Sequence, residues 1–359
     1  MVAPDATAAP LTFVVGTGRC GSTALSQVLR LHPSILGLSE LFATVEPGAL
    51  PDEPLDGAEF WRLLASPRPF ADRMIRDGTP VPEHLYPHSP GRFAAGGGQG
   101  VPALCLTTLP HLTDDPDALF DALRPALVAR SRGPAAGHYR ALFAELAAHC
   151  GGRAVVERSG YSLPLVPALR RHFPEARFVH LYRDGPDCAL SMSRHPGFRL
   201  IEFLAGRARH HRATGHHHAR DPLAAQEPAS LERLLADDDF DLRAALDQPI
   251  PLARFGALWS RTITEGLAHL DALPPGFCVP LAFEELLDAP ERELTRLAAH
   301  LGVEPDPGWL GAASRLLDGD RRGAARDLAP AERAALEAAC APGTRALADR
   351  GQGRARRAG

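Results

Sequence analysis

The sequence predicts an α/β fold, a three-layer sandwich in which a central parallel sheet carries helices on both faces and receives helical insertions. Two observations support this prediction. Short apolar runs alternate with longer segments of helical periodicity, a pattern typical of parallel sheets. The first apolar run also ends in a glycine-rich turn that leads directly into a helix. The chain has 359 residues, 45% of them hydrophobic, which is enough to form a large core.

The strands are expected where the apolar runs are short and bounded by polar or glycine residues, at 11–16, 35–38, 154–157, 177–182 and 277–283. Between and after them, apolar side chains recur on one face of a helix. This spacing predicts helices at 22–31, 163–173, 186–193, 252–273 and 291–301.

Residues 1–345 are expected to form one domain with two less regular blocks, at about 43–150 and 196–250. The first block predicts helices at 59–75, 118–129 and 138–150, with a long Pro- and Gly-rich mobile loop at 78–102. Residues 346–359 are rich in Gly, Ala and Arg and are expected to be a flexible basic tail.

The charge composition limits both the partners and the kind of anion site. The formal net charge is -4, so no overall basic field favours nucleic acid as a partner. All 39 basic residues are arginines, so a phosphate site in this chain must use guanidinium groups and backbone N–H groups rather than lysine. No signal peptide or membrane span is predicted, and no CxxC pair occurs. We therefore expect a cytoplasmic protein with reduced thiols.

The loop between the first strand and the first helix, Gly16–Thr23, is the first candidate site. Its glycines let the backbone turn tightly and present successive N–H groups, and the following helix N-terminus favours an anion. A Walker A loop would have lysine where Ser22 stands, and a dinucleotide-binding loop is matched only by its glycines. The arginine inside the loop indicates a direct anion ligand. The candidate ligands are Arg19, Cys20, Gly21, Ser22 and Thr23.

A second segment, Phe178–Ser191, repeats this arrangement. A strand is expected to end at Arg183, and a helix to begin near Pro186. Ser191 lies eight residues after Arg183, about two helical turns on. An arginine at a strand end and a hydroxyl on the following helix can hold one phosphate together.

Taken together, the two segments resemble the 3′-phosphoadenosine 5′-phosphosulfate (PAPS)-dependent sulfotransferases, whose fold is similar to that of the P-loop NTPases. In that family the first loop binds the 5′-phosphosulfate, and an Arg…Ser pair eight residues apart binds the 3′-phosphate. The matching residues here are Arg19, Gly21, Ser22 and Thr23 for the first group, and Arg183 and Ser191 for the second. The proline of the second segment stands one place later than is usual, whereas Asp187 keeps its place.

Further segments extend the resemblance. Val156–Gly160 is similar to a family segment in which a basic residue faces the phosphosulfate, which implies a contact from Arg158. Leu281–Leu286 is similar to a common Y-E-D-L segment, with Phe283 in place of the tyrosine. Arg322, in a basic-glycine segment, resembles a family segment that closes over the 3′-phosphate.

The resemblance implies transfer of a sulfuryl group from PAPS to the hydroxyl of a small-molecule, sugar or lipid acceptor, with PAP as product and no metal requirement. Some family members, including tyrosylprotein and several bacterial sulfotransferases, use a glutamate base after an H-P segment. Here His32–Pro33 precedes Glu40, which lies 21 residues after Arg19. We expect Glu40 to be the general base and Arg19 to stabilise charge on the leaving oxygen.

Two other functions stay open at this point. A P-loop small-molecule kinase would bind ATP with magnesium, although the loop lacks its lysine, and a non-catalytic module would bind PAP without turnover. The histidines at 210–211 and 216–218 lie in a polar stretch without cysteine, so no metal site is predicted there.

Overall fold

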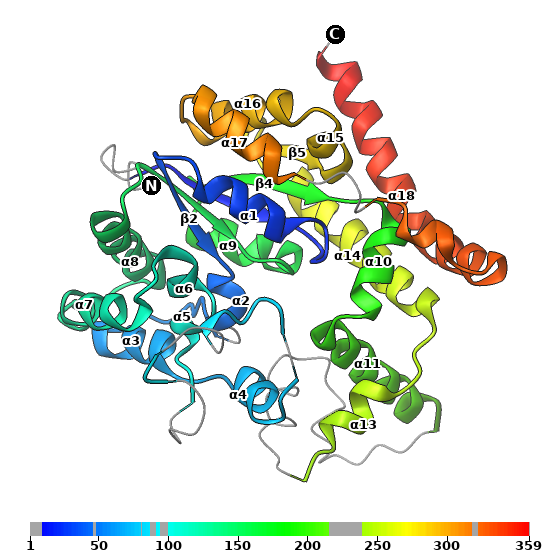
Figure 1. Cartoon of the computed structure of the whole chain (residues 1–359), viewed down its shortest axis with the longest axis horizontal. Helices are drawn as coiled ribbons and strands as arrows, with labels where there is room; N and C mark the ends of the chain where they lie inside the picture. Colours follow the sequence, from blue (N-terminus) through cyan, green and yellow to red (C-terminus); the bar gives the residue numbers. More distant parts are fainter. Residues whose placement is uncertain are drawn as a thin grey trace.

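The computed structural model describes residues 9–45, 48–79, 81–86, 91–93, 100–214, 239–317 and 322–358, with side chains left aside at 210–214 and 352–358. Its centre is a five-stranded sheet with the order β2-β3-β1-β4-β5, in which every pair is parallel. The predicted α/β class is therefore confirmed (Figure 1). The strands are β1 (Leu11–Val15), β2 (Ile35–Ser39), β3 (Ala154–Arg158), β4 (Arg177–Tyr182) and β5 (Cys278–Ala282).

The helices that follow the strands lie close to their predicted positions. They are α1 (Ser22–Arg30), α9 (Val166–His172), α10 (Gly185–Ser193), α14 (Leu252–Asp271) and α16 (Pro290–Leu301). The remaining helices are α2 (Leu41–Val45), α3 (Gly57–Ala65), α4 (Pro69–Arg76), α5 (Ala103–Leu106), α6 (Thr108–Leu112), α7 (Pro116–Val128), α8 (Ala135–Cys150), α11 (Pro196–Thr214), α13 (Leu242–Asp247), α15 (Phe283–Asp288), α17 (Pro307–Leu316) and α18 (Pro330–Ala358), with short 3₁₀ turns η2 (Leu163–Leu165) and η4 (Ala324–Asp327).

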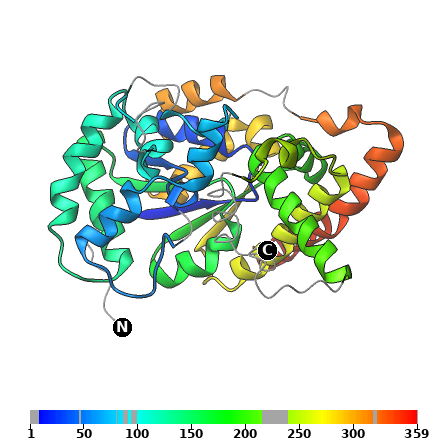
Figure 2. The same cartoon turned by 90° about the horizontal axis from the view of Figure 1, so that it is seen from below.

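Strands β1 and β3 are buried at every position, as expected for strands with helices on both faces. Helix α1 contacts α17 on one face, whereas α9 contacts α14 on the other. Figure 2 shows the helices of 57–150 gathered on one side of the molecule, and α11, α14 and α18 on the opposite side. The phenylalanines at 13, 42, 173 and 178 form one ring cluster in the core.

Two predicted helices are wrong in detail. The single helix predicted at 59–75 is two helices, α3 and α4, because Pro67 and Pro69 interrupt it. Proline cannot donate the helical hydrogen bond, and it disfavours helical backbone in the residue before it. The 163–173 helix begins as the 3₁₀ turn η2 and continues as α9. Residues 346–358, expected to be a flexible tail, belong to α18.

Most of the predicted site residues lie at the carboxyl ends of strands or in the segments that follow them. After β1 the chain continues to β2, which lies on one side of β1 in the sheet. After β3 the chain continues to β4, which lies on the other side of β1. Such a point of divergence is where open α/β sheets bind their ligands, beyond the carboxyl ends of the strands. Among the described residues, no helix is long and apolar enough to cross a membrane.

Candidate functional site

Four neighbouring strands bring the predicted residues together. Glu40 follows β2, Arg158 is the last residue of β3, the Gly16–Thr23 loop follows β1 and Arg183 follows β4. Because these strands are adjacent and parallel, their carboxyl ends form one row. Segments far apart in the sequence thus meet at the carboxyl-terminal end of the sheet.

The loop after β1 has the backbone of an anion cradle. Gly18, Arg19 and Gly21 have positive φ angles of 74°, 56° and 92°, and a non-glycine residue such as Arg19 adopts this conformation only at some cost in energy. Gly21 is the N-cap of α1, and no side chain caps the helix. The first N–H groups of α1 therefore have no capping side chain, which suits an anion.

Two aromatic rings leave no room for a side chain at Gly18 and Gly21 unless the rings move. A Cβ on Gly18 would lie 2.5 Å from the ring of Phe198, and a Cβ on Gly21 would lie 2.1 Å from the ring of Phe283. The two rings therefore cover the loop directly. Phe283 occupies the position that is tyrosine in the resembling family, and the structure places it against the loop. Burial raises the pKa of the Cys20 thiol to about 11. Cys20 can therefore bind a ligand through its backbone N–H group but not through a thiolate.

Arg19 is held by two partners. Its Nε donates to Ser191 Oγ at 3.2 Å, and its NH1 lies 2.7 Å from Glu83 Oε1. Glu83 Oε2 in turn lies 2.9 Å from His195 Nε2. The contact with Ser191 joins the two segments predicted from sequence, because the loop arginine and the α10 serine meet directly.

Sequence analysis missed Glu83 and His195. Burial disfavours the charged form of Glu83, but the hydrogen bond and charge of His195 and the charge of Arg19 together lower its pKa to about 2. Glu83 is thus a carboxylate across the physiological pH range. It lies in the Pro- and Gly-rich stretch that was predicted only as a loop, and no motif spacing marks it.

Glu40 and Arg158 form a buried ion pair. The side chains are 8% and 3% exposed, and Arg158 NH1 donates to Glu40 Oε1. The second oxygen, Oε2, accepts the Gly160 N–H at 2.9 Å. A Cβ on Gly160 would lie 3.3 Å from Glu40 Oε1 and 3.7 Å from Ser22 Oγ, so the carboxylate lies close to the first turn of α1.

The guanidinium of Arg158 is oriented by further hydroxyl groups. Its Nε donates to Ser26 Oγ at 2.7 Å and its NH2 donates to Ser39 Oγ at 2.6 Å. Ser26 belongs to α1 and Ser39 to β2, so Arg158 ties three elements together. Glu40 itself has a φ of 58°, a conformation that bulky residues rarely adopt.

A second buried glutamate lies beside this pair. Glu157 Oε1 accepts from Ser159 Oγ at 2.6 Å. Burial, with a smaller contribution from the charge of Glu40, raises the pKa of Glu157 to about 8, against the effect of the Ser159 hydrogen bond. Glu157 is therefore mostly neutral at pH 7, and Arg158 forms its ion pair with Glu40.

Asp187 stabilises the second predicted anion-binding segment, Phe178–Ser191. Its Oδ1 and Oδ2 accept the N–H groups of Ala325 at 2.9 Å and Gly323 at 2.6 Å. Arg183 NH2 lies 3.4 Å from Asp187 Oδ2, and its guanidinium lies 5.5 Å from the centre of the Phe283 ring. Asp187 thus holds the start of η4 close to Arg183 through hydrogen bonds.

The remaining predicted residues are placed as follows. Arg322 precedes Gly323, whose N–H group donates to Asp187, but the Arg322 side chain forms an ion pair with Asp288. Thr23 is exposed in the first turn of α1, and Ser22 is buried. No group of three metal-ligating side chains occurs within the described residues. His210 and His211 belong to α11, without described side chains, and the histidines at 216–218 lie outside the described residues.

No protein-family model matches the chain, and no curated protein sequence matches it. Among solved structures, the chain is similar to a sulfotransferase domain from the curacin biosynthetic pathway, at 16% identity and a TM-score of 0.42, covering 87% of this chain and 79% of that one. It is also similar to a sulfotransferase domain from the Synechococcus PCC 7002 olefin synthase, at 18% identity and a TM-score of 0.42, covering 93% and 95%.

A sulfotransferase from Alicyclobacillus acidocaldarius is similar at 18% identity and a TM-score of 0.38, covering 94% of each chain.

Proposed function

We propose that the chain is a sulfotransferase that moves a sulfuryl group from PAPS to a hydroxyl of a small-molecule acceptor and releases PAP. The observation that carries this proposal is the contact between Arg19 and Ser191. It joins two anion-binding segments, the loop after β1 and the Arg183–Ser191 segment. A nucleotide with a phosphosulfate on one side of its ribose and a phosphate on the other needs two such groups side by side.

The loop residues would hold the phosphosulfate. The backbone N–H groups around Gly18 and Gly21, where φ is positive, and the uncapped start of α1 would bind the same anion. Arg19 supplies a guanidinium that stabilises negative charge on the oxygen leaving sulfur. Because a guanidinium does not release a proton in proteins, the role of Arg19 is electrostatic.

Arg183 and Ser191 would hold the 3′-phosphate. The Arg183 side chain is 11% exposed and lies over Phe283, so its guanidinium is fixed in direction before a ligand arrives. Asp187 keeps the backbone of Gly323 and Ala325 at the same place. This attachment puts Arg322 on the segment nearest the proposed 3′-phosphate, and we propose that Arg322 exchanges its exposed partner Asp288 for that phosphate.

Glu40 is the proposed general base. In the proposed step the acceptor oxygen forms a bond to sulfur while the bond from sulfur to the bridging oxygen breaks, and the hydroxyl proton passes to the Glu40 carboxylate. Arg158 and the Gly160 N–H keep that carboxylate in one orientation, next to the first turn of α1. Glu157 remains neutral and adds no second negative charge to the sulfuryl site.

Calorimetric titration with PAP, and with ATP plus magnesium in parallel, tests this function. The proposal expects PAP to bind without metal and far more tightly than ATP. Binding of ATP with magnesium but not of PAP would contradict it and favour a phosphoryl-transfer enzyme. PAP binding without turnover on a wide panel of alcohols would instead indicate a binding module.

A further inference from the structure

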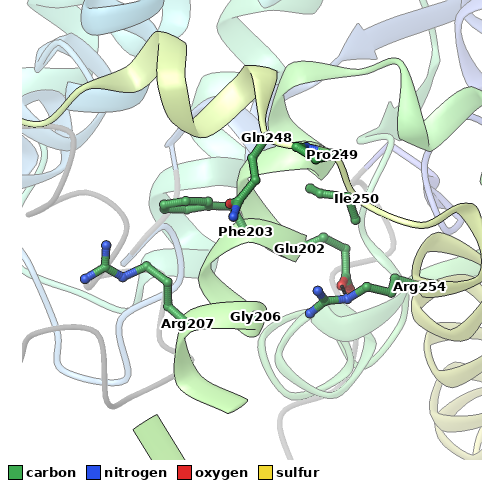
Figure 3. A pocket seen from close by; sticks show the side chains of 8 residues that line it. All are labelled: Glu202, Phe203, Gly206, Arg207, Gln248, Pro249, Ile250 and Arg254. Carbon is green, nitrogen blue, oxygen red and sulfur yellow. Dashed lines mark ion pairs between the residues drawn. The ribbon is translucent and has the colours of Figure 1, made fainter. Parts of the chain in front are cut away.

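A cavity of about 480 Å³ lies between α11 and the segment that joins α13 to α14. Its volume is within the range of small-molecule sites. Figure 3 shows the side chains of Phe203, Gln248, Ile250 and Arg254 arranged around it, with Arg207 beyond Phe203. None of these residues belongs to the anion-binding segments described above.

The cavity itself is lined by two arginines, Arg207 and Arg254, and one carboxylate, Glu202. Glu202 is buried, and its Oε2 lies 3.1 Å from Arg209 NH2 and 3.2 Å from Arg254 Nε. Two guanidinium groups thus share one carboxylate. Arg207 also lines the cavity and forms no ion pair with any described residue. Two further carboxylates, Asp241 and Asp247, line an adjoining groove.

A glycine within α11 makes room for one of the arginines. A Cβ on Gly206 would lie 3.0 Å from Arg254 NH2 and 3.3 Å from its NH1. Glycine in a helix interior is less favourable than alanine, so a glycine here needs a local reason. The guanidinium of Arg254 lies against the bare helix surface, and Figure 3 shows it beside Glu202 and Gly206.

The other wall is apolar. Phe203, Pro249 and Ile250 line it, and the Arg207 guanidinium lies 5.9 Å from the centre of the Phe203 ring. Arginines aligned next to apolar surface suit an oxyanion attached to an apolar body, because a guanidinium binds a carboxylate or phosphate through two parallel hydrogen bonds. We propose that this cavity binds the acidic group of an organic anion with an apolar body.

Helix α11 links the cavity to the loop after β1. Phe198, in its first turn, covers Gly18, and the cavity residues lie from Glu202 to Arg207 along the same helix. With a rise of 1.5 Å per residue, the two places are on the order of 10 Å apart. Resting on the proposed function, this makes the acceptor a hydroxylated organic acid whose acidic group the cavity would hold.

Calorimetry with three simple probes tests the cavity: octanoate, octyl phosphate and octanol, each titrated into the full chain at low salt with PAP in excess. PAP in excess keeps the probes out of the proposed cofactor site. We expect octanoate or octyl phosphate to bind and octanol to bind at least ~10-fold more weakly, since a hydrogen bond to a charged group is worth about that factor. Equal binding of all three probes would overturn the proposal.

Three variants locate the site. Arg207→Met should weaken anion binding ~10-fold, and Arg254→Met should do the same. Arg243→Met is the matched control, because Arg243 lies on α13 with its side chain 91% exposed and lines neither cavity nor groove. Arg254→Met also leaves Glu202 with one partner fewer, so thermal unfolding of each variant is recorded. Unchanged anion binding in Arg207→Met would overturn the proposal whatever the stability of Arg254→Met.

The same samples separate the two proposals. PAP binding with no anion binding would overturn the cavity proposal alone. Anion binding that depends on Arg207, in a chain that does not bind PAP, would support the cavity site and contradict the sulfotransferase function.

Discussion

The guanidinium of Arg19 lies 2.7 Å from a carboxylate oxygen of Glu83, 64 residues away in the chain. This contact places a negative charge against the loop residue to which we assign the phosphosulfate. Glu83 is itself oriented by His195. The proposed anion and the Glu83 carboxylate therefore compete for the same guanidinium.

Glu83→Gln should tighten PAP binding about fivefold. An ion pair between partly exposed groups is worth up to about 1 kcal/mol, and its loss removes a competitor for Arg19. Calorimetric titration of the wild type and the variant measures the effect. Glu291→Gln, an exposed change on α16, is the matched control. Equal affinities in wild type and Glu83→Gln would contradict the competition.

Glu157→Gln should change how stability depends on pH. The folded-state pKa of Glu157 is raised to about 8, above the ordinary value near 4.5, so between these values the folded state binds more protons than the unfolded state. This group therefore makes the free energy of unfolding fall as pH rises from about 5 to 8. Urea unfolding at several pH values should show that the decline is smaller in Glu157→Gln. An identical decline in both proteins would show that Glu157 ionises normally.

Glu40→Gln should lower turnover by a factor of about 10² to 10⁴, as expected for loss of a general base, while PAP affinity stays within about threefold. The variant leaves Arg158 buried beside a neutral amide, so thermal unfolding is recorded to define the temperature range in which it is folded. Turnover close to that of the wild type would remove Glu40 from the mechanism. Glu291→Gln again serves as the control for a change of one carboxylate.

The positions of the five strands could be predicted from the sequence, because each strand is a short apolar run bounded by polar residues or glycine. The Arg19–Ser191 contact could also be anticipated, since both residues belong to segments that begin at the ends of predicted strands. Glu83 and His195 could not, because a loop without periodicity does not show where its side chains come to lie. The split of α3 from α4 was readable in principle from Pro67 and Pro69.

The ion pair between Arg158 and Glu40 could not be predicted from the sequence either. The sequence indicated that Arg158 and Glu40 both follow strands, but the pairing of β2 with β3 is a tertiary fact. That pairing places the two residues in contact and buries them. The cavity beside α11 depends on packing between segments distant in the sequence, and no motif in the sequence indicates it.

The most direct measurement compares PAP with adenosine 5′-phosphate, which lacks the 3′-phosphate, in the wild type and in Arg183→Ala. Arg315→Ala, an exposed change on α17, is the control. If Arg183 holds a 3′-phosphate, the wild type and the control bind PAP at least about 10-fold more tightly than adenosine 5′-phosphate, and Arg183→Ala loses most of that difference. Equal binding of the two nucleotides by the wild type would contradict the assignment of PAPS.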